Sequence, residues 1–345
     1  MSTSPTVLPQ RDDRMSREAS SAEDGVSPSR SGTALLRALV AETARRPEGV
    51  RRRALSATRK ARLLAGDPAV RVVVDGSELV MPLSHDLPIH RARYPEYSRN
   101  LGTVAAALDE TRPGAPIVDV GANVGDSVAI IRAQVPHASI LCIEGDAQFL
   151  PYLHHNVRGL TGVEVAPVYV RHSAGSDGGT MTVVRVGGTA SLVEQAGEGS
   201  VDAVTTRSLA AILAEHPDFE HLGLLKLDTD GHDADILLLA ESVLAEARPV
   251  VFFEFDPSMA SDVGGADPHC ALAMLARLGY CRALIFTNTG DLAGVLEVDA
   301  WASDMATMAA EIGPGWPVAY FDVCVFSPTH LDVADEVARR ERARP

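Results

Sequence analysis

The chain has 345 residues, of which 46% are hydrophobic and 22% charged, and its formal net charge is −15. This composition excludes a wholly disordered, collagen-like or coiled-coil protein. The excess of acidic residues disfavours nonspecific nucleic-acid binding, which depends on neutralising phosphates. No stretch approaches the roughly 20 apolar residues that span a bilayer, and the N-terminal charges are not followed by the apolar run of a secretory signal. We therefore expect a cytoplasmic protein that does not use a membrane.

The N-terminal part of the chain changes character near residue 33. Residues 1–32 contain eight Ser and three Pro with almost no apolar side chains, which predicts a disordered tail. Residues 34–65 contain nine Arg or Lys against two acids, a net charge of +7, in a helical pattern. We interpret this basic stretch as a solvated face packed on an acidic body, and contact with RNA or an acidic substrate is the alternative.

A β-hairpin is predicted next. The apolar runs Val70–Val74 and Glu78–Pro82 flank Asp75-Gly76, a dipeptide suited to a tight type I′ turn. Together with the helical stretch before it and the helix that ends near Leu108, this hairpin predicts an N-terminal helical and β-hairpin cap over residues 33–112.

Short apolar runs alternate with helical stretches from about residue 115, which is typical of an α/β domain with a mainly parallel sheet covered on both faces. We place this domain at 113–330 and a charged C-terminal tail at 331–345. The expected strands are Ile117–Val120, Ile140–Ile143, Val163–Val168, Leu222–Leu227, Val250–Phe255, Ala283–Phe286 and Val318–Phe326. The expected helices are Val124–Gln134, Ala147–Val157, Asp233–Ala247 and Pro268–Leu278.

The first of these strands ends in a glycine-rich turn, in the segment PIVDVGANVG. Asp119 ends the strand, and Gly121, Ala122, Asn123 and Gly125 follow before the next helix. Ligands of open α/β sheets bind outside the carboxyl ends of the strands, and glycines there let the backbone approach them closely. A dinucleotide-binding turn would read GxGxxG, and an acid before the first glycine would repel a pyrophosphate. Asp119 and the turn suit instead the amino-acid part of S-adenosylmethionine, which carries an ammonium group.

The second strand supports a nucleoside-containing ligand. Glu144 ends this strand, 19 residues after Gly125, where a carboxylate would accept hydrogen bonds from ribose hydroxyls. Asp119 as a helix cap and Glu144 as a solvated loop acid are the alternative. The two acids together, in a βαβ context, favour the nucleoside.

Four segments in succession resemble the motifs of FkbM-type, class I S-adenosylmethionine-dependent methyltransferases. They are VDVGANVGDS, CIEGDAQFLPYLHHNV, LLKLDTDGHDADILLLAESVL and VVFFEFDP. The resemblance covers roughly residues 115–330 and implies a Rossmann-like sheet of seven strands in the order 3-2-1-4-5-7-6, with an antiparallel last strand. It also implies methyl transfer to oxygen, commonly on a hydroxyl of a secondary metabolite or sugar in natural-product biosynthesis. His232 departs from the side chain that many members carry at this position.

The fourth core strand carries the candidate catalytic residues. Lys226 and Asp228 lie on one face of it because side chains alternate along a strand. We expect Asp228 to contact the cofactor or the acceptor, and His232, which titrates near neutral pH, to accept the proton. The alternatives are an ion pair of Lys226 with Glu254 and a solvent-facing His232.

A metal and a lid are weaker expectations. Asp228 and Asp256 end adjacent strands and could ligate Mg²⁺, but such acids are common without a metal, so we favour a metal-free site. Methyltransferases of this class carry a lid before the core, in the segment His85–Leu101 of this chain. The candidate lid residues are Tyr94, Tyr97, Arg99 and Asn100, with simple packing of the tyrosines as the alternative.

We therefore predict an S-adenosylmethionine-dependent O-methyltransferase acting on a hydroxyl of a small molecule. The alternatives are an N- or RNA-directed methyltransferase that uses the basic helix, and a non-catalytic nucleoside-binding protein. The sequence does not indicate an oligomeric state, and a homo-oligomer is compatible with it.

Overall fold

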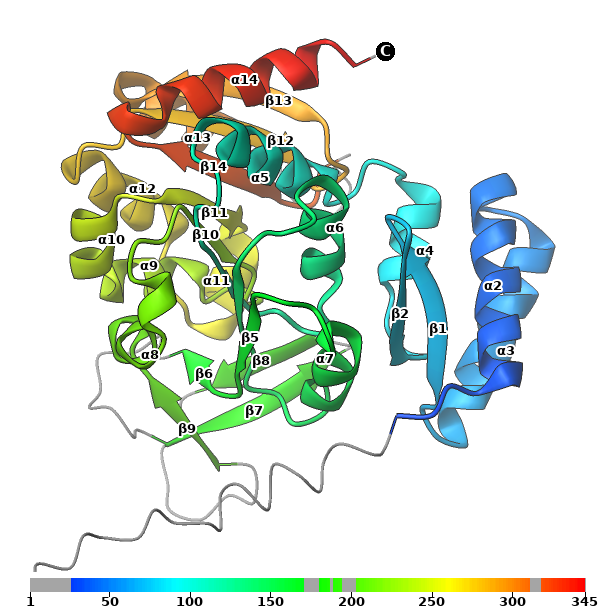
Figure 1. The fold of residues 1–345 in the computed structure, drawn as a ribbon. Helices are drawn as coiled ribbons and strands as arrows, with labels where there is room; N and C mark the ends of the chain where they lie inside the picture. The colour runs from blue at the N-terminus through cyan, green and yellow to red at the C-terminus, as the bar shows by residue number, and fades with distance from the viewer. Residues whose placement is uncertain (1–25, 171–179, 187–188, 194–202, 311–317, 345) are drawn as a thin grey trace, which may run out of the picture.

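The computed structural model describes residues 26–170, 180–186, 189–193, 203–310 and 318–344 (Figure 1). Most of the tail predicted at 1–32 lies outside these residues. Its described end already begins helix α2 (Arg30–Arg45), where the side chain of Ser29 accepts a hydrogen bond from the backbone N–H of Gly32. None of the helices in these ranges has the length and apolar character needed to cross a membrane.

An eight-stranded sheet forms the centre of the molecule, with the strands in the order β13-β12-β14-β11-β10-β3-β4-β5. All neighbouring pairs from β11 to β5 are parallel, and β14 is antiparallel to both β11 and β12. The strands are β3 (Ile117–Val120), β4 (Ile140–Ile143), β5 (Val163–Ala166), β10 (Leu224–Leu227), β11 (Val250–Phe255), β12 (Arg282–Thr287), β13 (Leu292–Glu297) and β14 (Phe321–Phe326).

The predicted count of seven strands is wrong, because β13 is added at the edge outside β12. The two strands form an antiparallel hairpin across the turn that follows Thr287. The sequence of β13, LAGVLE, has no continuous apolar run, and its residues are exposed or only partly buried. An edge strand of this kind carries little hydrophobic signal.

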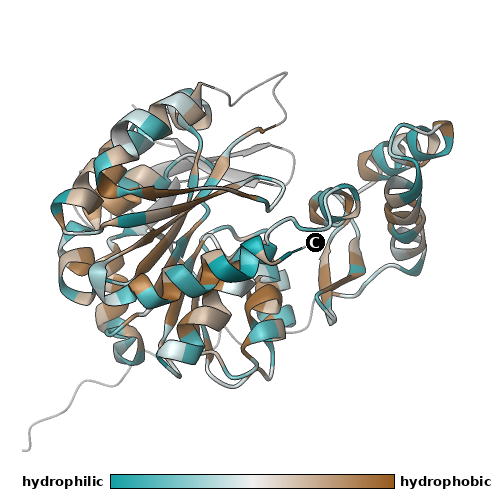
Figure 2. Cartoon of the chain, turned by 90° about the horizontal axis from the view of Figure 1, so that it is seen from above, coloured by the Kyte–Doolittle hydropathy of each residue, from teal (hydrophilic) through white to brown (hydrophobic). Residues whose placement is uncertain are grey.

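Residues of the central strands alternate between two apolar cores, one on each face of the sheet, and Figure 2 shows these strands as mainly apolar between more polar helices. One core includes residues of α5 (Arg99–Thr111), α6 (Asp126–Gln134), α7 (Leu150–Val157) and α14 (Leu331–Arg342). The other includes residues of α8 (Leu209–Glu215), α9 (Asp233–Leu239), α10 (Glu241–Ala247), α12 (Pro268–Arg277) and α13 (Trp301–Ala309). The remaining short elements are α11 (Pro257–Val263) and the 3₁₀ turns Pro217–Phe219, Val298–Ala300 and Pro328–His330.

The N-terminal elements stand to one side of this domain (Figures 1 and 2). They are α2, α3 (Val50–Leu64), β1 (Ala69–Val74), β2 (Ser77–Pro82) and α4 (Leu87–Arg93). The turn between β1 and β2 has positive φ at both Asp75 (45°) and Gly76 (87°), as a type I′ turn requires. The side-chain amide of Asn156 on α7 joins the hairpin to the domain, since it donates to the carbonyl oxygens of Val80 and Val124 at 2.8 Å each.

A smaller sheet follows β5, with strands in the order β6-β9-β7-β8. Its strands are β6 (Tyr169–Val170), β7 (Thr180–Val186), β8 (Thr189–Val193) and β9 (Ala203–Arg207). β7 pairs antiparallel with β8 and with β9.

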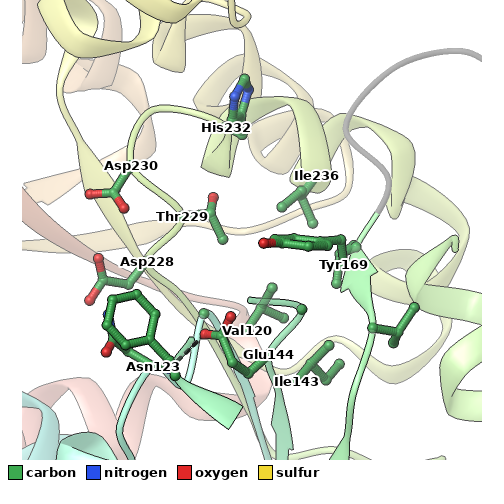
Figure 3. A pocket seen from close by; sticks show the side chains of 15 residues that line it. Val120, Asn123, Ile143, Glu144, Tyr169, Asp228, Thr229, Asp230, His232 and Ile236 are labelled. Atoms are coloured by element: carbon green, nitrogen blue, oxygen red, sulfur yellow. Dashed lines mark hydrogen bonds between the residues drawn. The ribbon is translucent and has the colours of Figure 1, made fainter. Parts of the chain in front are cut away.

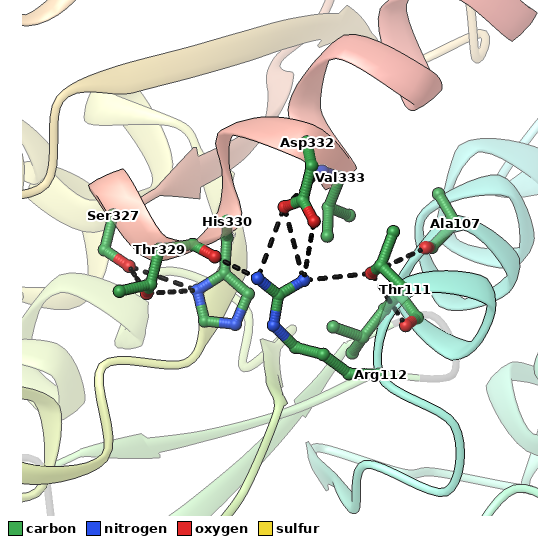
Figure 4. A network of polar contacts seen from close by, with 9 residues as sticks. Ala107, Thr111, Arg112, Ser327, Thr329, His330, Asp332 and Val333 are labelled. Atoms are coloured by element: carbon green, nitrogen blue, oxygen red, sulfur yellow. Dashed lines mark hydrogen bonds and ion pairs between the residues drawn. The ribbon is translucent and has the colours of Figure 1, made fainter.

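The charged tail predicted at 331–345 is instead helix α14 over Leu331–Arg342. Val333, Ala334, Val337 and Ala338 are buried against the sheet domain, so a regular apolar stripe lies within the charged sequence. Arg112, just after α5, contacts the start of this helix through Asp332 and donates to the carbonyl oxygen of Thr329 (Figure 4).

The burial of α14 makes a direct prediction for stability. Val337→Ala removes both γ-methyl groups from a side chain with 0% exposure, and we expect it to lower the free energy of unfolding by about 2 kcal/mol. Val73→Ala at a 66% exposed position is the control and should change it by less than about 0.5 kcal/mol. Urea denaturation of the full chain measures both, and equal effects would contradict the packing of α14.

Candidate active site

Two cavities adjoin at the carboxyl ends of the parallel strands, where ligands of such sheets bind. The larger has a volume of about 370 Å³ and is lined by the cap segment that begins at His85, the glycine turn, β10, β11 and the start of β14. The smaller, about 70 Å³, is lined by the same glycine turn, the end of β4, β6 and the start of α9 (Figure 3). Gly121, Asn123, Asp228 and Asp230 line both.

The glycine turn is held in one conformation by its own contacts. Gly121 has a φ of 76°, and a Cβ atom at this position would overlap the backbone carbonyl of Asp228. The backbone N–H of Asn123 donates to Glu144 at 2.8 Å, which links the turn to the end of β4. Ala122 is buried and Gly125 begins α6 against Leu153, and neither lines a cavity. Of the four predicted residues of the turn, Gly121 and Asn123 are therefore the two that line the cavities.

Asp119, which we expected to contact the ligand, is fully buried and lines neither cavity. Its carboxylate lies 2.9 Å from the Nζ of Lys226 and accepts a hydrogen bond from Ser127. Asp119 and Lys226 are direct register partners on the parallel strands β3 and β10. The partner of Lys226 is thus Asp119 rather than Glu254.

Besides its ion pair with Asp119, Lys226 contacts two residues that line the cavity. Its Nζ lies 3.4 Å from the carboxylate of Asp228 and donates to the carbonyl oxygen of Gly121 at 3.3 Å. Burial lowers the pKa of Lys226, but the carboxylates of Asp119 and Asp228 outweigh it and raise this pKa above its ordinary value. Lys226 is therefore a permanent cation that braces the glycine turn and cannot accept a proton. The Asp228 side chain is 55% exposed, so its carboxylate is accessible from the cavity although it contacts Lys226.

Glu144 lies where the sequence predicts, at the end of β4, and is buried with 8% exposure. It accepts hydrogen bonds from the backbone N–H groups of Asn123 and Asp146, and burial raises its pKa to about 7. The ring of Tyr169 packs on Gly145, where a Cβ atom would overlap it. Figure 3 shows this ring across the cavity from Glu144. The sequence analysis missed Tyr169, because nothing in its local pattern distinguishes it from a packing residue.

His232 is buried with 4% exposure, so the solvent-facing alternative is wrong. It lines the smaller cavity, with its Nδ1 3.7 Å from the carboxylate of Asp235, and it is absent from the lining of the larger one. His232 therefore lies on the side of Glu144 and Tyr169.

The predicted lid residues divide into two pairs. Tyr97 and Asn100 line the larger cavity, where the hydroxyl of Tyr97 lies 3.2 Å from that of Tyr320. Tyr94 and Arg99 line neither cavity, since Tyr94 contacts Arg93 and Arg99 pairs with Glu96.

Two carboxylates that the sequence analysis did not select face this cavity. Glu254 on β11 and Asp322 on β14 are direct register partners, so their side chains lie on the same face of the sheet. The side-chain amide of the fully buried Asn100 donates to Asp322 at 3.2 Å. Burial raises the pKa of Asp322 to about 7 and, with the carboxylates of Asp228 and Asp233, raises that of Glu254 well above its ordinary value.

The weak metal candidates do not come together as a site. Asp256 caps α11, because its carboxylate accepts from the backbone N–H groups of Ser258 and Met259, and it lines neither cavity. In the described part of the chain, no group of three or more His, Cys, Asp or Glu side chains is arranged to hold a metal ion.

The contact between Gly121 and Asp228 can be tested with a matched pair of glycines. Gly121→Ala and Gly114→Ala both place alanine at a positive φ, which costs about 1–2 kcal/mol, but nothing lies within 4 Å of a Cβ at Gly114. We expect Gly121→Ala to lower the free energy of unfolding by about 2 kcal/mol more than Gly114→Ala, because of overpacking against Asp228. Guanidinium denaturation of both variants gives the difference, and its absence would contradict the close approach.

Solved structures similar to this chain include several methyltransferases, all at low identity. The methyltransferase FkbM of Methylobacillus flagellatus KT is 16% identical with a TM-score of 0.30, over 50% of this chain and 42% of that protein. Fibrillarin of Aeropyrum pernix, solved with natively bound S-adenosyl-L-methionine, is 11% identical with a TM-score of 0.33, over 75% and 82% of the two chains. The plantazolicin methyltransferase BpumL, solved with SAH, is 10% identical with a TM-score of 0.34, over 85% and 95%. TM-scores this low carry no information on substrate.

The family comparison is specific. No curated protein matches the chain at a significant level. Residues 119–281 match the model of the methyltransferase FkbM domain, and these residues include the glycine turn, Glu144, Lys226 and Glu254. Residues 119–281 therefore match the same family that the sequence motifs resemble.

Proposed function

We propose that the protein is an S-adenosylmethionine-dependent O-methyltransferase that acts on a hydroxyl of a small molecule, such as a secondary metabolite or a sugar moiety. The observation that supports this most is the larger cavity, which extends from the glycine turn to the facing carboxylates Glu254 and Asp322. This cavity thus offers proton acceptors at one end, and at its other end the glycine turn, shared with the smaller cavity, offers a place for a methyl donor.

The residues around the glycine turn fit the methyl donor. Since a side chain at Gly121 would fill the turn, the backbone there can approach a ligand closely. Glu144 would accept hydrogen bonds from ribose hydroxyls, and the ring of Tyr169 would lie against the base. Asp228, at the border of both cavities, would meet the ammonium group in place of Asp119, which is engaged by Lys226. When bound, S-adenosylmethionine supplies a methyl group on a sulfonium for in-line displacement.

The proton acceptor that the geometry favours is the pair Glu254 and Asp322, instead of His232. The acceptor oxygen forms a bond to the methyl carbon while the carbon–sulfur bond breaks, and the hydroxyl proton passes to the carboxylate pair. A base with a pKa near 7, which burial gives to Asp322, is well matched to such a transfer at neutral pH. His232 lines the cavity on the side of Glu144, away from these groups.

The charges of the larger cavity favour a neutral or cationic acceptor. Six acidic residues line it, and the one lysine or arginine among its lining residues is Lys226, which is already paired with Asp119. The acids are Asp86, Asp126, Asp228, Asp230, Glu254 and Asp322. Phosphate groups would be repelled here, which disfavours RNA as the acceptor.

Binding of the methyl donor is the first test. We expect wild-type protein to bind S-adenosylmethionine and S-adenosylhomocysteine in calorimetry, and Glu144→Ala to weaken binding at least tenfold. Glu246→Ala, an exposed acid on α10, is the control and should bind as the wild type does. No binding of either compound to the wild type would overturn the proposed function.

The assignment of the base has its own test, with a labelled methyl donor and a screen of hydroxylated acceptors. Asp322→Asn and Glu254→Gln should each lower kcat about 10²–10⁴-fold with little change in the dissociation constant of S-adenosylhomocysteine. Because the base must be deprotonated, the wild-type rate should rise with pH and level off above about pH 7. A larger loss of kcat in His232→Ala than in either carboxylate variant would return the role to His232.

A further inference from the structure

One arginine of the basic helix α3, Arg59, is largely removed from solvent by contacts within the cap. α3 has no fully buried residue; Arg51, Arg53 and Lys60 are exposed, and Arg52 and Arg62 are partly buried. The side chain of Arg59 is only 12% exposed. Its guanidinium points to the segment between β2 and α4, residues 83–86.

Arg59 binds four consecutive residues of that segment. Its Nε donates to the carbonyl oxygen of Leu83 at 2.8 Å. One terminal nitrogen donates to the carbonyls of Ser84 at 2.6 Å and His85 at 3.2 Å, and the other to the carboxylate of Asp86 at 2.6 Å. The planar fork of arginine can reach several acceptors at once in a fixed geometry, which the single ammonium of lysine cannot.

The segment held by Arg59 contacts the glycine turn through His85. The Nδ1 of His85 accepts from the backbone N–H of Leu87, so its Nε2 carries the hydrogen and donates to the side-chain oxygen of Asn123 at 3.3 Å. Asn123 in turn donates its backbone N–H to Glu144. His85 and Asn123 both line the larger cavity. A continuous path of hydrogen bonds therefore joins α3 to the residue proposed to bind ribose.

We propose that Arg59 is a positioning residue for methyl-donor binding: it fixes residues 83–86 so that His85 supports the glycine turn at Asn123. This inference rests on the proposed function, and it gives helix α3 a role in the binding of the methyl donor. Asn123 has a φ of 48°, a left-handed conformation that a non-glycine residue adopts at some cost. A side-chain contact that holds Asn123 in this conformation should preorganise the turn for its ligand.

The test measures the dissociation constant of S-adenosylhomocysteine by calorimetry in the full-length protein. Arg59→Ala should raise it at least tenfold, and Arg59→Lys should not restore it. Lys60→Ala, at the adjacent exposed position of the same helix, is the matched control and should bind like the wild type. Should Arg59→Ala fail to fold, Arg59→Lys alone carries the comparison with Lys60→Ala.

A double-mutant cycle separates positioning from a general loss of stability. If Arg59 acts through His85, then Arg59→Ala should change binding less than threefold in a His85→Ala background, because residues in one network are not additive. A full tenfold effect in that background, or an Arg59→Ala variant that binds like the wild type, would overturn the inference while leaving the proposed function intact. Failure of the wild type to bind would instead overturn the proposed function, and this inference with it.

Discussion

The buried ion pair between Lys226 and Asp119 is the interaction on which the site depends. Two charges removed from water are costly unless each is paired and hydrogen-bonded. Here Asp119 also accepts from Ser127, and Lys226 also reaches Asp228 and the carbonyl of Gly121. The pair therefore fixes the ends of β3 and β10 relative to each other, and both cavities are built on the loops that follow these strands.

The alternation of side chains along the strands explains why the charged residues of neighbouring strands lie on the same face of the sheet. Asp119, Lys226, Glu254 and Asp322 all lie on the sheet face whose core includes α5, α6 and α14. Their neighbours one position away belong to the core on the opposite face. The polar groups are thus gathered at one end of one face, where the cap covers them, and the low polarity around them raises the pKa values of the carboxylates.

The sequence predicts the buried strands and the glycine turn, because continuous apolar runs and the glycine-rich pattern after Asp119 are local signals. It does not predict the partner of Lys226, since the choice between Asp119 and Glu254 depends on which strands are neighbours and in what register. Asp322 was missed for the same reason: only the antiparallel pairing of β14 with β11 brings it beside Glu254. The error at α14 is different, because the stripe Val333, Ala334, Val337 and Ala338 has helical spacing that the surrounding charges conceal.

Hydrogen bonds at two places hold the N-terminal cap to the methyltransferase-like domain. Its hairpin is held to α7 by Asn156, which also binds the carbonyl of Val124 in the glycine turn. Its following segment is held by Arg59 and reaches the same turn through His85. Two independent contacts from the N-terminal elements therefore converge on residues 123–124. A ligand of the turn would therefore meet a backbone that contacts from the N-terminal elements restrain.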